Sequence, residues 1–531
     1  MSGAALFSFA SQLDTNYCPT DNELEQIKSF LVEARARLAR IDQERDALAG
    51  EIAAYEALIS PIRRIPDDVL EEIFSACLPP DRNCAMSASD APLLLSRVCG
   101  RWRNVAFRTP SLWSRLHIAQ PAVRGWLPML SKDEAWENMI SSKVAQRLAA
   151  ARQWLERSGD CPLTISFVAA EGSDPHAQAA FFQLLVDYIR RWRAISLKFQ
   201  LLAGSELREH FNQLQRESAP LLAKFSLDVM GSSTMGEPMN WSTLMLLDGA
   251  SLTHIDLSYC GPGILSIPIQ WHRLTSMSFS ENPANVTSED LAQLFSRTTS
   301  LQSLELSFNG TPPPLQTVQA IVSPVQKLWL SEPYNFMAQL VTSELTLLDI
   351  QLVREADAGL QTLLHVLSCS KKLETLRIIS ALGLDPLKQL FSALPTSLRE
   401  LDVVERGRRS FPLGPRIDDS LLSILNVEGA LPRLERMSLA LDCDGHFSED
   451  RIVEFLQGRI QAGLERHHSP PLFRRFQLTY ARLPAFSTIV DAQSNRLRQF
   501  SEVGIDISLQ YPPLPSLSPF PAMKVRSVPW W

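Results

Sequence analysis

The sequence predicts an α plus α/β protein in three parts: a long heptad helix, a small helical domain, and a curved solenoid of strand-plus-helix units. Three observations predict this fold. Apolar residues follow a heptad spacing over residues 20–59, and two short amphipathic stripes with proline boundaries lie within 60–118. An L-x-x-L-x-L pattern recurs from 222 to 478, within a predicted solenoid of residues 162–510. A chain of 531 residues is too long for one hydrophobic core, which agrees with this division.

Composition narrows the class of protein. The formal net charge is −7 and the pI is near 5.8, which argues against a nucleic-acid binder. No apolar run approaches the roughly 20 residues that span a bilayer, and residues 1–10 lack the positive start of a secretory signal. The eight cysteines show no paired spacing, which predicts reduced thiols. We expect a cytoplasmic or nuclear protein, or one found in both compartments.

The first periodic segment begins after residues 1–19, which we expect to be disordered. Thr20 and Glu23 form a T-x-x-E capping box, which marks a helix start. Two interpretations of the heptad seam stay open: a coiled coil that pairs two copies or recruits a helical partner, and a single helix packed on the domains that follow. Ala34 and Arg45 weaken the seam. The seam residues are Leu24, Ile27, Leu31, Ala34, Leu38, Ile41, Arg45, Leu48, Ile52, Tyr55 and Ile59.

Residues 60–118 predict a very small helical domain. Pro66 suits a first helical position, and Asp67 and Asp68 suit the positive end of the helix dipole. A second apolar helix is expected to end at Thr109-Pro110, and the insert 79–92 between them is expected to be a surface loop. A hydrophobic core this small gives little stability by itself, so the domain is expected to bind a partner. The two apolar stripes are Val69, Leu70, Ile73 and Phe74, then Leu94, Leu95, Val98, Cys99, Trp102 and Ala106.

Four short motifs follow one another in this domain. They are Ile65-Pro66, L-x-x-I-F over 70–74, V-C-x-x-W over 98–102, and P-S-L-W over 110–113. Together they resemble an F-box. With a helix before and leucine-rich repeats after, the chain resembles the F-box proteins abundant in mushroom-forming (basidiomycete-type) fungi. A helical connector is expected over 119–161, where similar fungal proteins show such a passage before their repeats.

The repeated pattern begins at Leu222/Phe225/Leu227 and predicts one strand per copy. Helical stretches such as 288–297 and 360–367 lie between copies, so stacking gives a curved leucine-rich-repeat solenoid. Cys260, Asn282 and Asn309 supply the polar ninth residue of three copies. The later copies start at Leu252, Leu274, Leu301, Val325, Leu345, Leu373, Leu398, Leu434 and Phe473.

Side chains alternate along a strand, so the residues between the apolar positions should line the concave surface. Aromatic and arginine side chains often anchor protein interfaces, and Trp329 stands out; its alternative is a tryptophan covered by a neighbouring loop. Other residues expected on this face are Asp228, His254, Asp349 and Glu400. The predicted target-binding residues are Asp256, Glu305, Lys327, Trp329, Arg377, Asp402 and Arg475.

The Pro/Ser-rich tail 511–531 allows two interpretations. Its PPLP segment at 512–515 fits a P-x-x-P ligand for an SH3-type groove. The favoured alternative is an extended strap that caps the open end of the solenoid, with Trp530 and Trp531 covering apolar edges.

Catalytic signals are weak. His467 and His468 are adjacent and would diverge, and the segment 442–446 lacks the spacing of a calcium or zinc site. Cys99 is expected to be small and buried within its helix. No cofactor or metal is expected, and we expect a non-catalytic protein.

The resemblance implies the substrate-recognition subunit of an SCF-type ubiquitin ligase. It would bind a Skp-type adaptor, and through it a cullin, and hold a target protein on the repeats. Two alternatives stay open: a leucine-rich-repeat scaffold outside ubiquitination, and a hydrolase within 400–470. The implied adaptor-binding residues are Ile65, Pro66, Val69, Leu70, Ile73, Phe74, Val98, Cys99 and Trp102.

Overall fold

The computed structural model forms two compact units, Met1–Cys77 and Leu78–Trp531, and each is described by itself. The described residues are 12, 15–121, 134–169, 174–199, 206–229, 241–249, 251–258, 263–281, 287–308, 320–331, 335–352, 357–380, 384–405, 419–426, 431–441, 447–464, 472–480, 490 and 494–511.

The first unit contains helix α1 (Asp21–Ile59), the 3₁₀ turn η3 (Pro61–Arg64) and helix α2 (Asp67–Ala76). The predicted capping box is confirmed: the Glu23 carboxylate accepts hydrogen bonds from the Thr20 backbone N–H (2.8 Å) and hydroxyl (2.7 Å). Helix α1 runs for 39 residues and buries none of them. Its seam is therefore continuous and open to solvent.

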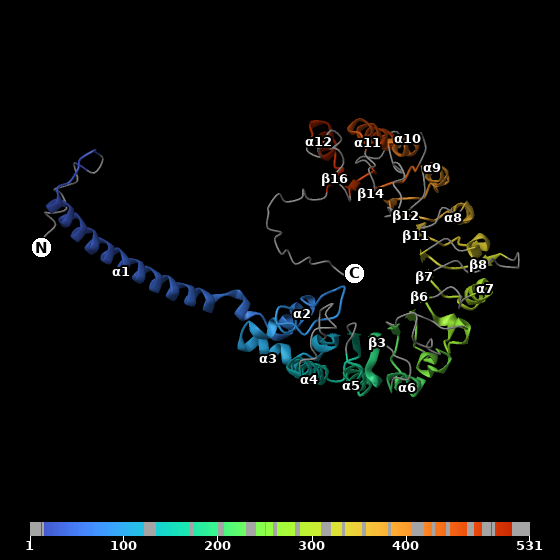
Figure 1. Ribbon diagram of the computed structural model, residues 1–531, viewed down its shortest axis with the longest axis horizontal. Helices are drawn as coiled ribbons and strands as arrows, with labels where there is room; N and C mark the ends of the chain where they lie inside the picture. Colours follow the sequence, from blue (N-terminus) through green and yellow to red (C-terminus); the bar gives the residue numbers. More distant parts are fainter. Residues whose placement is uncertain are drawn as a thin grey trace. The chain divides into compact units, whose positions relative to one another are not determined.

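The second unit is built on one parallel sheet of 14 strands, in which each strand pairs with its neighbours along the chain (Figure 1). All ten strands expected from the L-x-x-L-x-L pattern belong to it, so the predicted solenoid is confirmed. The strands are β1 (Arg115–Ala119), β2 (Leu163–Val168), β3 (Trp192–Phe199), β4 (Lys224–Val229), β5 (His254–Ser258), β6 (Ser276–Glu281), β7 (Ser303–Phe308), β9 (Lys327–Leu330), β11 (Leu347–Leu352), β12 (Thr375–Ser380), β13 (Glu400–Glu405), β14 (Arg436–Leu441), β15 (Arg475–Tyr480) and β16 (Asp506–Gln510).

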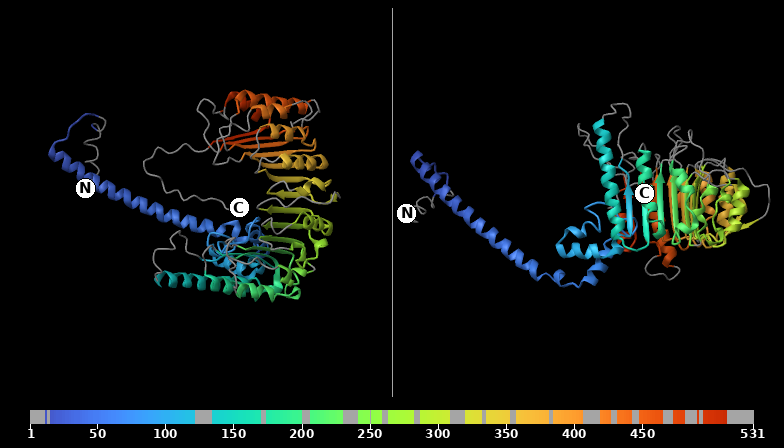
Figure 2. Two further views of the ribbon diagram at one scale, coloured as in Figure 1. Left: turned by 45° about the vertical axis from the view of Figure 1, so that its right-hand side comes forward. Right: turned by 90° about the horizontal axis from the view of Figure 1, so that it is seen from below.

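Helices cover the outer face of this sheet, while the strands line the inner face of the curve (Figures 1 and 2). Short 3₁₀ turns replace α-helices between β4 and β6. Two short strands, β8 (Ile321–Val322) and β10 (Leu340–Val341), pair separately. The helices are α3 (Gly100–Arg108), α4 (Glu134–Arg157), α5 (Pro175–Val186), α6 (Glu206–Asn212), α7 (Ser288–Arg297), α8 (Asp357–Cys369), α9 (Leu384–Ser392), α10 (Asp419–Leu425), α11 (Glu449–Leu464) and α12 (Asn495–Glu502).

The core lies between the sheet and the helices. Along β13, for example, Leu401 and Val403 are buried while Asp402 and Val404 are half-buried on the opposite face. This alternation follows from the two-residue period of a strand. Each fully buried leucine stabilises the fold by roughly 1.5–3 kcal/mol relative to an exposed one.

The sheet extends beyond the ten expected strands at both ends. Strands β1, β2 and β3 precede the expected set, and β16 follows it. Strand β2 begins directly after Pro162. Helix α4 is the crossover between β1 and β2, so the expected connector forms part of the first repeat. Helix α4 ends at Arg157, and Gly159 shortly after it has φ +52°, which ends the helical path.

The insert 79–92 was expected to be a surface loop, and this expectation is wrong. Part of the insert is buried and forms hydrogen bonds with β1 and β2. Cys84 has no exposed surface, and its carbonyl accepts a hydrogen bond from the His117 backbone N–H of β1 (2.8 Å). Asn83 Nδ2 donates to Ser166 Oγ of β2 (3.0 Å). Burial raises the pKa of the Cys84 thiol. The insert therefore caps the first edge of the sheet, which would otherwise expose unpaired backbone groups.

The second predicted helix also differs from the expectation. Residues 95–97 form a 3₁₀ turn, and α3 begins only at Gly100. Cys99 is exposed at the N-cap, where its Sγ accepts a hydrogen bond from the Trp102 backbone N–H (3.4 Å). The expectation of a buried Cys99 is wrong because the helix starts after this residue, so its side chain caps the helix instead of packing.

Several expectations fall outside the described residues. They concern the ninth-position residues Cys260, Asn282 and Asn309, the segments 442–446 and 467–468, the tail from 512 onward, and most of 1–19. Among the described residues, no helix is long and apolar enough to cross a membrane. Within the same ranges, no group of three or more His, Cys, Asp or Glu side chains could hold a metal ion.

Candidate functional site

Helix α2 carries two apolar stripes, one buried and one open. Leu70 and Phe74 have no exposed surface, whereas Val69 is 45% exposed and Ile73 is 38% exposed. Each stripe joins residues four apart, which lie on one side of a helix. Pro66 is exposed at the N-cap. The six adaptor-binding residues implied for this segment therefore divide: Leu70 and Phe74 stabilise the fold, while Pro66, Val69 and Ile73 are accessible, and Ile65 is half-buried.

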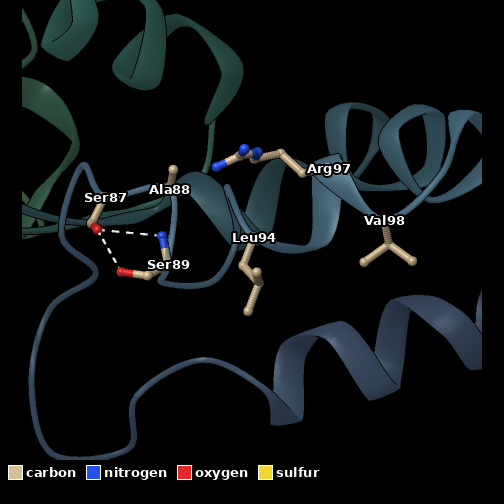
Figure 3. Close-up of a pocket in the computed structure, with 6 residues that line it drawn as sticks. All are labelled: Ser87, Ala88, Ser89, Leu94, Arg97 and Val98. Atoms are coloured by element: carbon tan, nitrogen blue, oxygen red, sulfur yellow. Dashed lines mark hydrogen bonds between the residues drawn. The ribbon is translucent and has the colours of Figure 1, made fainter. Parts of the chain in front are cut away.

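A second apolar surface lies in the other unit, around the turn before α3. Leu94 is 47% exposed and Val98 is 57% exposed. Both line a shallow hollow of about 620 Å³, and Figure 3 shows their side chains pointing to the same side, away from Arg97. The rim is formed by the insert, where the Ser87 and Ser89 hydroxyls lie 2.8 Å apart. Leu94 was assigned to the apolar stripe but not to the adaptor-binding set.

The P-S-L-W motif is structural. Trp113 is fully buried, and its Nε1 donates to the Ala106 carbonyl of α3 (2.8 Å). Its ring meets Trp154 of α4 edge-on at 4.9 Å, and the Arg157 guanidinium lies 4.8 Å from its centroid. This tryptophan therefore joins α3 to the first crossover helix. Trp102, the last residue implied for adaptor binding, is half-buried.

The inner face of the sheet gathers most of the predicted target-binding residues in one row. Strand register places Trp329 of β9 between Glu305 of β7 and Asp349 of β11. The same row contains Asp256 on one side, with Ser278 between it and Glu305. It continues through Arg377 and Asp402 on the other side, whereas Lys327 and Arg475 lie one row away.

In the strands from β12 onward, charges on this face pair with each other. Arg377 contacts Asp402 (3.3 Å) and Asp349 (3.8 Å). Arg436 contacts Glu400 at 3.0 Å. Arg475 contacts Asp506 at 2.7 Å. We call these strands, β12 to β16, the paired section. Predicted target-binding residues Arg377, Asp402 and Arg475 are thus engaged within the sheet.

The strands from β5 to β11 have a different electrostatic character. Burial and the nearby Asp256 carboxylate raise the pKa of Glu305, while a hydrogen bond from Ser278 opposes this rise. Burial also raises the pKa of Asp349, an effect that Arg377 partly offsets. Within the described ranges, no ion pair engages Asp256 or Glu305. We call Asp256, Glu305, Trp329 and Asp349 the acidic patch. Carboxylates beside a half-buried indole suit a cationic side chain, which gains both charge pairing and a cation–π contact.

Serines line the same row on the first strands. Ser166, Ser196 and Ser226 follow one another in register from β2 to β4, and Ser226 donates to the Asp256 carboxylate (2.8 Å). The row starts at His117, whose Nδ1 lies 2.9 Å from Ser166 Oγ. Burial lowers the pKa of His117. The L-x-x-L-x-L pattern did not detect β3, because Trp192 stands where the pattern has its first leucine. A pattern that also accepts an aromatic residue at this position would detect the strand.

Comparison with known proteins gives one family. Residues 62–119 match the family model described as F-box-like. Solved structures similar to this chain include a protein from Bacteroides fragilis (11% identity, TM-score 0.30), covering 61% of this chain and 80% of that one. Another is the leucine-rich repeat-containing protein LegL7 from Legionella pneumophila (14% identity, TM-score 0.32), covering 64% of this chain and 97% of that one. No curated protein matches the chain.

Proposed function

We propose that this chain is the substrate-recognition subunit of an SCF-type ubiquitin ligase. The F-box-like match over residues 62–119 is the observation that carries this proposal, since F-box domains generally bind Skp-type adaptors. The long parallel solenoid that follows supports it, because an extended concave sheet is a common protein-binding surface. In this role the chain is non-catalytic. It raises the effective concentration of target lysines near the ubiquitin carrier.

The adaptor would contact the open apolar residues inside the match. On α2 these are Val69 and Ile73, beside Pro66, and around the hollow they are Leu94 and Val98. Exposed aliphatic side chains favour a protein partner, because covering them removes apolar surface from water.

Co-purification of the full-length chain with a Skp-type adaptor tests this function. A Val69→Asp, Ile73→Asp double variant should lose the adaptor, because two carboxylates would be buried without partners. Val503→Asp is the matched control, since Val503 is 46% exposed and lies outside the match. Thermal unfolding of all three proteins shows whether each is folded.

Stoichiometric binding by the wild type and the control, lost in the double variant, would support the ligase subunit. If folded wild-type protein fails to bind any Skp-type adaptor, the proposal is wrong. A leucine-rich-repeat scaffold outside ubiquitination would then be the better explanation.

For the target, we propose a basic segment held by the acidic patch. The patch combines three carboxylates with Trp329, and no ion pair among the described residues neutralises Asp256 or Glu305. Fluorescence anisotropy with arrays of basic and acidic peptides of equal length tests this recognition. Basic peptides should bind, Trp329→Ala should weaken them by about tenfold, and Arg436→Gln in the paired section should not. Preferential binding of acidic peptides would contradict this target class.

A further inference from the structure

Helix α1 presents a long apolar seam that nothing in the structure covers. Its 39 residues span about 58 Å at 1.5 Å per residue, and the structure buries none of them. Most helical stability in proteins comes from packing an apolar face, so a helix of this length is expected to gain a partner for its seam. Exposed seam residues include Leu24, Leu31, Leu38, Ile41, Leu48, Ile52, Tyr55 and Ile59.

The charges beside the seam are divided along the helix. Taking Leu24 as heptad position a, the flanking e and g positions begin with Asp21 and Glu23 in the first turn. They continue with three basic residues, Lys28, Arg35 and Arg37. In the C-terminal half they include four acids, Asp42, Glu44, Glu51 and Glu56. Charges at these positions set which helices pair and in which direction. At these positions a basic set at 28–37 is followed by an acidic set at 42–56, and this order complements its own reverse.

We propose that α1 pairs with α1 of a second copy of this chain as an antiparallel coiled coil. In the register that overlaps the whole seam, Leu24 faces Tyr55 of the second copy and Leu38 faces Ile41. Arg35 then lies beside Asp42 of the second copy, and Arg37 lies beside Glu44. Each pair occurs twice because of the twofold symmetry.

The two weak seam positions favour the antiparallel direction. In the antiparallel register Arg45 faces Ala34 of the second copy, so the long side chain lies over the smallest one. A parallel pair would instead place two Arg45 side chains together in the seam, with two Ala34 residues leaving a gap. Flanking charges suit both directions about equally, so the seam decides. A parallel pair would bring Glu51 beside Glu56 of the second copy, but it would also bring Glu23 beside Lys28 and Arg37 beside Asp42. The antiparallel register has one like-charge contact, between Asp21 and Glu56 near the helix ends.

Existing contacts of these side chains are compatible with the pair. Arg45 contacts Asp42 (3.3 Å) and Asp46 (2.9 Å) of its own helix, which offsets its charge within the seam. Among the described residues, Arg35, Arg37 and Glu44 form no ion pair, so their charged groups are available to a second copy. The dimer does not depend on the proposed ligase function.

Sedimentation of the full-length chain at micromolar concentration tests the pairing. The wild type should be a dimer. Leu38→Asp should give monomers, whereas Ala39→Asp, one position outside the seam, should not. A wild type that remains monomeric throughout the concentration range would overturn the proposal.

Charge exchange tests the direction. Arg35→Glu alone and Asp42→Arg alone should each weaken the dimer by at least about tenfold, because each places like charges side by side twice. An equimolar mixture of the two variants should restore it as a heterodimer. A parallel pair places Arg35 beside Phe30, so a dimer unaffected by Arg35→Glu and strengthened by Glu51→Lys would overturn the antiparallel arrangement.

Discussion

The acidic patch and the paired section lie on the same face of one sheet, yet their charged side chains differ in how far neighbouring charges compensate them. In the paired section each cation lies across from an acid, as Arg436 lies across from Glu400. In the acidic patch Glu305 lies between Ser278 and Trp329 with no cation beside it in its row. Under the proposed function, we therefore expect a charged residue on the concave face to bind the target only where its neighbours in the next strands leave it uncompensated.

The largest expected effect shows whether the two sections differ only at the surface. Leu304 of β7 and Leu376 of β12 are both fully buried in equivalent strand positions. Leu304→Ala and Leu376→Ala should each cost about 2–5 kcal/mol, because each leaves a cavity in the same kind of layer. Thermal unfolding checks this equality. A large loss for only one of them would mean that the difference between the sections reaches the core.

Removing a cation should affect the two sections unequally. Arg377→Ala leaves Asp349 and Asp402 without their common partner, so we expect a loss of about 1 kcal/mol. Lys327→Ala, beside the acidic patch, should change the free energy of unfolding by less than about 0.5 kcal/mol. Urea unfolding measures both changes. Equal losses in the two variants would mean that ion pairing does not distinguish the paired section from the acidic patch.

The outermost ion pair should be weak and sensitive to salt. Arg475 and Asp506 are about half exposed, so Arg475→Gln should cost roughly 0.2–1 kcal/mol at low ionic strength. The difference from the wild type should shrink at high salt, because exposed charges are screened. A loss that persists at high salt would indicate a packing role for the arginine stem.

The smallest effect concerns pH. The raised pKa of Glu305 means that the folded state binds a proton more tightly than the unfolded chain, so stability falls as pH rises from the ordinary glutamate range through the raised pKa. Glu305→Gln should therefore raise the free energy of unfolding near neutral pH by under about 0.5 kcal/mol, with a slightly higher melting temperature. This gain should disappear below about pH 4.

A matched change immediately before β14, next to the paired section, should have the opposite sign. Glu435→Gln removes the acceptor of an ion pair with Arg399 (3.1 Å) and should lower the melting temperature near neutral pH. Thermal unfolding across the acidic and neutral range measures both variants. A stabilising Glu435→Gln would contradict the comparison.

Much of this architecture could be predicted from the sequence because its signals are local. The L-x-x-L-x-L spacing predicted ten strands, and the capping box predicted the start of α1. The residues of the inner face were predictable as a set, since alternation alone assigns them. Which of them pair could not be predicted, because pairing depends on register between expected strands that lie 20 to 39 residues apart in the sequence. The same limit hid the burial of Cys84, whose contacts come from His117 rather than from nearby residues.

The strand β1 has a practical consequence for truncation. Residues 115–119 belong both to the F-box-like match and to the sheet, and the insert that covers β1 belongs to the match as well. A chain cut after residue 119 would therefore begin with β2 as a bare edge, deprived of its neighbour and its cover. We expect such a fragment to aggregate through that edge. The F-box-like region and the repeats therefore cannot be separated by cutting the chain at residue 119. Point variants are the better way to test the role of each.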